Sequence, residues 1–152
     1  MNQPLKVLLI EDEAWRYHNL LGFPIHLFWA RNHHDVDELL RFGPFDLVLW
    51  DHDLQSGYVS CHFESSLPIA EWFVKEAPEG WDETAMIVHS WNSNGGVYKL
   101  LCVLRERYPK TLRAPFGPYL YSALEALCGP VRTLFEAAPV IPHPSPETEA
   151  AE

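Results

Sequence analysis

The sequence predicts a single doubly wound α/β domain, in which a five-stranded parallel sheet carries helices on both faces. Short apolar runs at 6–10, 46–50 and 85–88 are typical of parallel strands that are covered on both sides. Segments with a helical pattern separate these runs, and regular alternation of strand and helix predicts parallel pairing with right-handed crossovers. A chain of 152 residues is long enough to bury the core of one such domain.

Glycine and proline divide the first half of the chain into strands and helices. Gly22-Phe23-Pro24 ends the first helix, and Gly43-Pro44 ends the second helix, whose expected N-cap is Asp35. The elements expected in this half are strands at 6–10, 25–30 and 46–50 and helices at 14–21 and 36–41.

The second half of the chain continues the alternation. The stretch 55–65 is polar and without a pattern, and a loop of that length in a compact domain is a candidate binding lid. The segment 92–96 supplies turn residues and capping side chains before a helix. The elements expected here are helices at about 66–77, 97–108 and 119–127 and strands at about 85–88 and 111–114.

Charge and composition argue against several classes of function. The formal net charge is -10 and no stripe of Lys and Arg is present, so we do not expect binding to duplex DNA. The cysteines are odd in number and lack a C-x-x-C pair, which argues against a disulfide framework and a structural zinc site. No apolar stretch is long enough to span a bilayer, and the amino terminus passes directly into a strand, so we expect a cytoplasmic protein. We assign 1–138 to the domain and expect the Pro- and Glu-rich tail at 139–152 to be disordered.

Polar and titratable residues follow three of the predicted strands at the points where those strands end. These groups are Glu11-Asp12, Asp51-His52-Asp53 and His89-Ser90. The carboxyl ends of parallel strands meet at one edge of the sheet, where open α/β sheets bind their ligands. Gathered carboxylates raise each other's pKa unless a cation offsets their charge, and oxygen ligands suit Mg²⁺ or Mn²⁺. We therefore expect a divalent metal ion at Asp51 and at Glu11 or Asp12.

Three segments of this chain resemble, in order, the strand ends of response-regulator receiver domains, over about 6–127. They are KVLLIEDE at 6–13, DLVLWD at 46–51 and AMIVHS at 85–90. The resemblance implies the flavodoxin-like strand order 2-1-3-4-5 and makes Asp51 the phosphoryl acceptor. It also implies that Mg²⁺ is held by Glu11 or Asp12, by Asp51 and by the backbone carbonyl of Asp53, while Ser90 touches the phosphoryl oxygens.

The end of the fifth predicted strand departs from the receiver pattern. Receivers carry a lysine before a proline at this place, whereas this sequence has Ala114 before Pro115. Side chains alternate along a strand, so the neighbouring Arg113 is expected to point away from the site. The cation that reads out phosphorylation in receivers is therefore missing from this position.

Two further segments, LWDHDL at 49–54 and VHSWNSNGG at 88–96, resemble the paired signatures of a receiver-like family predicted to process cyclic phosphates. That family also carries an arginine after the acidic residues of its first strand, which Arg16 matches with one extra residue. In this hypothesis His52 and His89 exchange protons near neutral pH, and Asn92 and Arg16 donate to phosphoryl oxygens. A metal-activated water would open the cyclic phosphodiester.

The leading hypothesis is a phosphoesterase that depends on Mg²⁺ or Mn²⁺ and acts on a cyclic phosphate, at an RNA end or in a small nucleotide. The alternative is a stand-alone receiver that accepts phosphate on Asp51 from a histidine kinase. A third hypothesis is a degenerate receiver that binds a partner without chemistry. The missing lysine argues against the second hypothesis, and the retained acids and histidines argue against the third.

Overall fold

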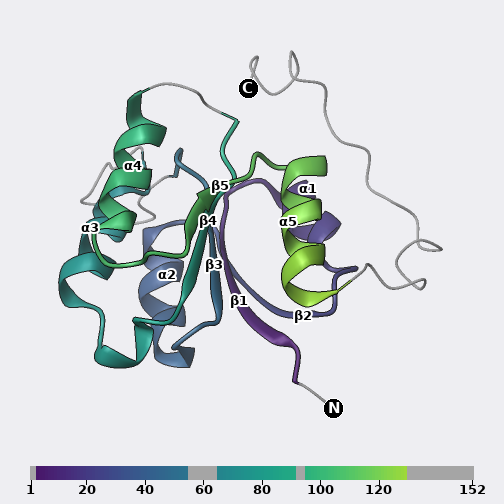
Figure 1. The fold of residues 1–152 in the computed structure, drawn as a ribbon, viewed down its shortest axis with the longest axis horizontal. Helices are drawn as coiled ribbons and strands as arrows, with labels where there is room; N and C mark the ends of the chain where they lie inside the picture. The colour runs from purple at the N-terminus through teal and green to yellow at the C-terminus, as the bar shows by residue number, and fades with distance from the viewer. Residues whose placement is uncertain (1–2, 55–64, 92–94, 130–152) are drawn as a thin grey trace.

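The computed structural model describes residues 3–54, 65–91 and 95–129, and within them the predicted parallel sheet is present (Figure 1). Its strands are β1 (Leu5–Ile10), β2 (Ile25–Ala30), β3 (Leu47–Trp50), β4 (Ala85–Val88) and β5 (Thr111–Arg113). All neighbouring strands pair in parallel, in the order β2-β1-β3-β4-β5. The predicted fold class and strand order are confirmed.

Helices cover both faces of the sheet (Figure 1). They are α1 (Ala14–Leu20), α2 (His33–Leu39), α3 (Leu67–Glu76), α4 (Gly95–Arg105) and α5 (Pro118–Cys128), with short 3-10 turns at Leu40–Phe42 and Glu79–Trp81. Helices α2, α3 and α4 lie on one side of the sheet, and α1 and α5 lie on the other.

The central strands divide their side chains between two apolar cores, because successive residues of a strand point to opposite faces. One core lies under α2, α3 and α4 and takes from these strands Leu8, Ile10, Val48, Trp50, Met86 and Val88. The other core lies under α1 and α5 and takes Val7, Leu9, Leu47, Leu49 and Ile87. Burial on both faces explains why the sequence shows continuous apolar runs rather than alternation.

The start of α2 differs from the prediction. Asn32, not Asp35, is the N-cap, and its side chain accepts a hydrogen bond from the Asp35 backbone N–H at 2.9 Å. The Asp35 carboxylate instead accepts from the Arg31 backbone N–H at 3.0 Å. Both residues are good capping residues, and only the backbone geometry decides which of them precedes the helix.

Several predicted features lie outside the described residues. These are most of the candidate lid, the end of the domain at 138 and the tail at 139–152. Among the described residues, no helix combines the length and the apolar character that crossing a bilayer requires.

Tyr108 links the end of α4 to the end of α3. Its side chain is fully buried, and its hydroxyl donates to the Phe73 carbonyl at 2.9 Å. We expect Tyr108→Phe to lower the free energy of unfolding by about 1 kcal/mol, because the variant loses one buried hydrogen bond while Arg107 Nη1 still donates to the same carbonyl at 2.9 Å. Urea unfolding measures the change, and Tyr98→Phe, at an exposed tyrosine of α4, is the matched control. Equal losses in the two variants would contradict the role of this hydrogen bond.

Candidate functional site

Four residues, each directly after the end of a strand, lie side by side in one row across the sheet. Ile10, Trp50, Val88 and Arg113 are paired across β1, β3, β4 and β5. The residues that follow them are Glu11, Asp51, His89 and Ala114. The hydrogen bonds of the sheet continue through this row. The backbone N–H groups of Asp51, His89 and Ala114 donate to the carbonyls of Ile10, Trp50 and Val88, at 2.9, 2.9 and 3.0 Å. Alternation puts the four side chains on the face that α1 and α5 cover.

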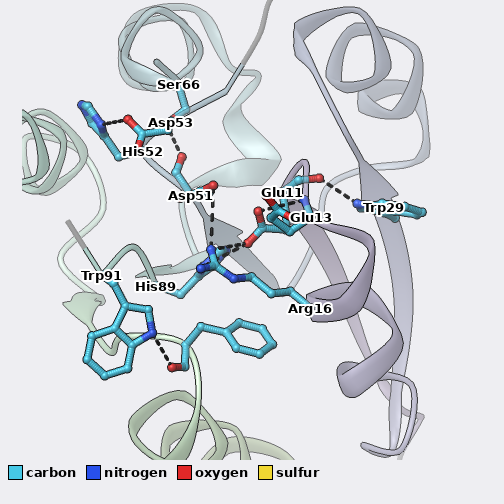
Figure 2. Close-up of polar contacts among 11 residues, drawn as sticks. Glu11, Glu13, Arg16, Trp29, Asp51, His52, Asp53, Ser66, His89 and Trp91 are labelled. Atoms are coloured by element: carbon cyan, nitrogen blue, oxygen red, sulfur yellow. Dashed lines mark hydrogen bonds and ion pairs between the residues drawn. The ribbon is translucent and has the colours of Figure 1, made fainter. Parts of the chain in front are cut away.

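Arg16 of α1 lies over this row and joins its two carboxylates (Figure 2). Its Nη1 donates to Glu11 Oε1 at 2.9 Å and lies 4.0 Å from Asp51 Oδ2. The Nδ1 atom of His89 lies 3.7 Å from the same Glu11 oxygen. Relative exposure is 0% for Glu11 and His89, 5% for Asp51 and 7% for Arg16. The four residues, called the strand-end cluster below, therefore form a buried group of charged and polar side chains.

Two hydrogen bonds from neighbouring elements hold the backbone of the strand-end cluster in place. The Trp29 indole of β2 donates to the Glu11 carbonyl at 2.7 Å. The Ser66 hydroxyl, just before α3, donates to the Asp51 carbonyl at 2.6 Å. Sequence reasoning did not assign either residue to the site, and no local signal marks them, because both contacts depend on how distant segments pack.

Aromatic rings cover the strand-end cluster on the side of α1 and α5. The Arg16 guanidinium lies 5.0 Å from the Trp15 ring centroid and 5.5 Å from that of Phe116. The His89 ring meets Phe116 edge-on at 5.9 Å. The exposed Trp91 indole donates to the Phe116 carbonyl at 2.8 Å, so this tryptophan holds the Phe116 segment in place. These rings limit water access and strengthen electrostatic interactions within the cluster.

Burial shifts the pKa values of the strand-end cluster. Burial raises the pKa of Asp51 to about 7, and the Arg16 charge only partly opposes this change. Burial and the neighbouring Asp51 raise the pKa of Glu11. Burial and the Arg16 charge lower the pKa of His89 to about 3. His89 is therefore a neutral imidazole at pH 7, and the two carboxyl groups together hold fewer than two negative charges.

Other predicted site residues border this cluster and are more exposed, and the charges of Asp12 and Asp53 help to raise the pKa of Asp51. Asp12 is exposed. His52 pairs with the exposed carboxylate of Asp53, with Nδ1 2.9 Å from Oδ1, on the far side of Asp51 from Glu11 and Arg16 (Figure 2). The structure thus brings His89 to the carboxylates and leaves His52 beside Asp53.

The remaining predicted residues follow β4 and β5. Ser90 is buried one residue beyond the row, and its carbonyl accepts from Arg113 Nη2 at 3.3 Å. Asn92 lies outside the described residues. Ala114 takes the fourth place of the row, and its methyl group brings no charge to Asp51.

Comparison with known proteins identifies the architecture. No family model matches the sequence, and no curated protein matches it. Solved structures do match, among them a CheY-like response regulator receiver domain from Methylobacillus flagellatus, with 16% identity, a TM-score of 0.57 and coverage of 82% of this chain and 98% of that chain. The chain has the receiver fold.

Two more receiver structures show the same likeness. The chemotaxis response regulator CheY4 of Vibrio cholerae is 11% identical, with a TM-score of 0.58 and coverage of 82% of this chain and 96% of that chain. The signal receiver domain of an HD domain-containing protein from Pseudomonas fluorescens Pf-5 is 16% identical, with a TM-score of 0.57 and coverage of 84% and 94%. At these identities the likeness establishes the receiver fold, and the chemistry has to be argued from the strand-end cluster.

The raised pKa of Asp51 predicts how stability depends on pH. Between about pH 4 and 7 the folded protein keeps a proton that the unfolded chain has released, so this group lowers stability as the pH rises through that window. We expect Asp51→Asn in a metal-free buffer to raise the free energy of unfolding at pH 8 by about 1–3 kcal/mol, and the gain to shrink toward pH 4.

The measurement is chemical denaturation across this pH range. The His89 contribution has the opposite slope, since its lowered pKa costs stability as the pH falls below about 6.5, but it is present in both proteins and largely cancels in the difference. Asp37→Asn, at an exposed carboxylate of α2, is the control and should show no such trend. A variant less stable than wild type at pH 8 would mean that the contact of Arg16 with Asp51 outweighs the cost of burying the carboxylate.

Proposed function

We propose that this chain is a phosphoryl-accepting receiver domain in which Asp51 is the acceptor and Arg16 supplies the positive charge that receivers usually take from a lysine. The observation that carries the proposal is the position of the Arg16 guanidinium, whose Nη1 lies 4.0 Å from Asp51 Oδ2. The fourth place of the row holds Ala114, so a cation from α1 takes over the role of a cation from β5.

The transfer step requires an ionised acceptor and a stabilised leaving group. An Asp51 oxygen attacks phosphorus and forms the acyl phosphate, while the bond from phosphorus to a phosphohistidine nitrogen or an acetyl phosphate oxygen breaks and the donor keeps that electron pair. Arg16 keeps part of the Asp51 population ionised and faces the side on which phosphoryl charge develops.

A divalent cation fits the same carboxylates. Glu11 and Asp51 end adjacent strands and are both buried, and when both are ionised the single Arg16 guanidinium offsets only one of their two charges. Mg²⁺ or Mn²⁺ held by these two residues would offset the charge of the incoming phosphoryl group. Asp12 and the carbonyl of Asp53 stay proposed ligands by resemblance to receivers.

The phosphodonor that fits this proposal is a histidine kinase or a small acyl phosphate. The matched structures from Methylobacillus flagellatus and Vibrio cholerae are described as a response regulator receiver domain and a chemotaxis response regulator. Signalling in a two-component pathway is therefore the biological role that we propose for phosphorylation of Asp51.

Hydrolysis of a cyclic phosphate is the second candidate function, and His89 is the observation that favours it. Its ring lies against the carboxylates, where it could exchange a proton with a small nucleotide or an RNA end. Two observations favour the receiver proposal instead. The pKa of His89 is far below neutral, which makes it a weak general base and a poor general acid at pH 7, and the other histidine, His52, lies beside Asp53.

We expect acetyl phosphate with Mg²⁺ to phosphorylate wild type on Asp51 and not to label Asp51→Asn. Arg16→Gln should slow labelling by about tenfold to a hundredfold, because one preorganised charge near the phosphoryl group is lost. Arg31→Gln, at an exposed arginine, is the matched control. Intact-protein mass spectrometry measures the added phosphate.

A second measurement asks which elements of the structure change when a phosphoryl mimic binds. Beryllofluoride should shift NMR resonances of α1 around Arg16 more than those of β5, since β5 offers no cation to the site. Labelling that persists in Asp51→Asn would contradict the assignment of the acceptor. Turnover of 2′,3′-cyclic or 3′,5′-cyclic phosphates that is lost in His89→Leu would instead support the second candidate function.

A further inference from the structure

His89 is fully buried without hydrogen bonds to its ring. Among the residues that the structure describes, neither Nδ1 nor Nε2 has a hydrogen-bond partner, and the relative exposure of the residue is 0%. Burial of an unpaired polar atom is unfavourable, so such atoms in native proteins call for an explanation. The edge-on contact of the ring with Phe116 supplies no hydrogen-bond partner for its nitrogens.

The Nδ1 atom is directed toward the carboxylates. It lies 3.7 Å from Glu11 Oε1, which is beyond hydrogen-bond distance. One ligand atom from each of Glu11, Asp51 and His89 lies within 4.8 Å of the other two. Metal ligands at about 2.0–2.2 Å from an ion lie up to roughly 4.4 Å apart, so small side-chain rotations would bring all three onto one ion.

We propose that Glu11, Asp51 and His89 form a three-ligand site that selects a first-row transition metal ion over Mg²⁺. Mg²⁺ favours oxygen ligands and retains water, whereas imidazole nitrogen suits Zn²⁺, Fe²⁺, Ni²⁺ and Cu²⁺ best, and Mn²⁺ accepts it more readily than Mg²⁺ does. His89 is therefore the residue that sets metal preference. The inference deepens the proposed function, since the ion would occupy the phosphoryl-accepting site, but it can be tested without phosphoryl transfer.

The sheet holds the three proposed ligands in fixed positions. Each of them is the residue directly after a paired strand, and the Glu11 and Asp51 carbonyls also accept hydrogen bonds from Trp29 and Ser66. Ligands carried on such rigid elements need little rearrangement to bind an ion.

Arg16 competes with the ion for Glu11. Its Nη1 lies 2.9 Å from the Glu11 oxygen that faces His89, so a metal ion bound there has to share or displace this contact. Removal of the guanidinium should therefore strengthen metal binding, whereas the proposed function predicts that the same change weakens phosphoryl acceptance. The opposite signs separate the two roles of the site.

The test measures Mn²⁺ and Mg²⁺ binding to the full chain by calorimetry. We expect wild type to bind Mn²⁺ more tightly than Mg²⁺, and His89→Leu to lose about tenfold or more in Mn²⁺ affinity with a smaller change for Mg²⁺. Arg16→Gln should bind Mn²⁺ more tightly than wild type. His34→Leu, at an exposed histidine of α2, is the matched control and should bind like wild type.

Pulsed EPR of Mn²⁺-loaded wild type gives a readout that needs no variant. Electron spin echo modulation from a directly bound imidazole nitrogen is the expected result, and it should be absent in His89→Leu. Mn²⁺ binding without this nitrogen signal would overturn the inference, even if His89→Leu failed to fold. Equal affinities of wild type for Mn²⁺ and Mg²⁺ would also overturn it.

Phosphorylation assays separate the inference from the proposed function. Nitrogen-coupled Mn²⁺ with no labelling of Asp51 by acetyl phosphate would support the metal site and contradict the receiver proposal. Labelling of Asp51 with no nitrogen-coupled ion would contradict the metal site and leave the receiver proposal supported.

Discussion

The parallel ladder across β1, β3 and β4 is the constraint on which the site depends. Because these strands pair in register at Ile10, Trp50 and Val88, the next residue of each strand falls in one row, on one face of the sheet. The ladder bonds continue through that row. A one-residue shift in any strand would turn its polar side chain to the opposite face, so the apolar pattern that sets the register also assembles the site.

Electrostatics then decides what the row can hold. Two carboxylates in a buried place repel one another and are poorly solvated, and a single guanidinium on α1 offsets part of that charge. Burial raises the pKa of Asp51 more than Arg16 lowers it, and burial together with the Arg16 charge keeps His89 neutral. Such unfavourable burial is typical of functional sites, where stability is lower than a purely structural core would give. A phosphoryl group, a metal ion or both would change this balance.

The strand-end cluster differs from the receiver pattern at two linked places. Ala114 leaves the fourth place of the row without a charge, and Arg16 of α1 brings a charge to the two carboxylates instead. Tyr98 of α4, Leu112 of β5 and Tyr119 of α5 are exposed hydrophobic side chains on the side of the molecule that β5 borders. No charged side chain at position 114 links Asp51 to these elements, because Ala114 carries only a methyl group. If Asp51 accepts a phosphoryl group as proposed, α1 is the first element to be affected, because its Arg16 pairs with Glu11 and lies 4.0 Å from Asp51.

The sequence by itself determined the fold class and the residues at the strand ends, because short apolar runs and glycine–proline breaks are local signals of alternating strands and helices. Through its resemblance to receiver domains, the sequence also supplied the strand order. It also predicted that Glu11 and Asp51 lie on adjacent strands and that Ala114 brings no cation. Only the tertiary structure decided which acidic and histidine side chains meet: Arg16 binds Glu11, His89 faces them, and His52 turns to Asp53. It also revealed the supporting contacts of Trp29 and Ser66. The physical reason is that the order of residues shows which residues end each strand. The face to which each side chain points depends on strand register, on the alternation of side chains and on how α1 packs against the sheet.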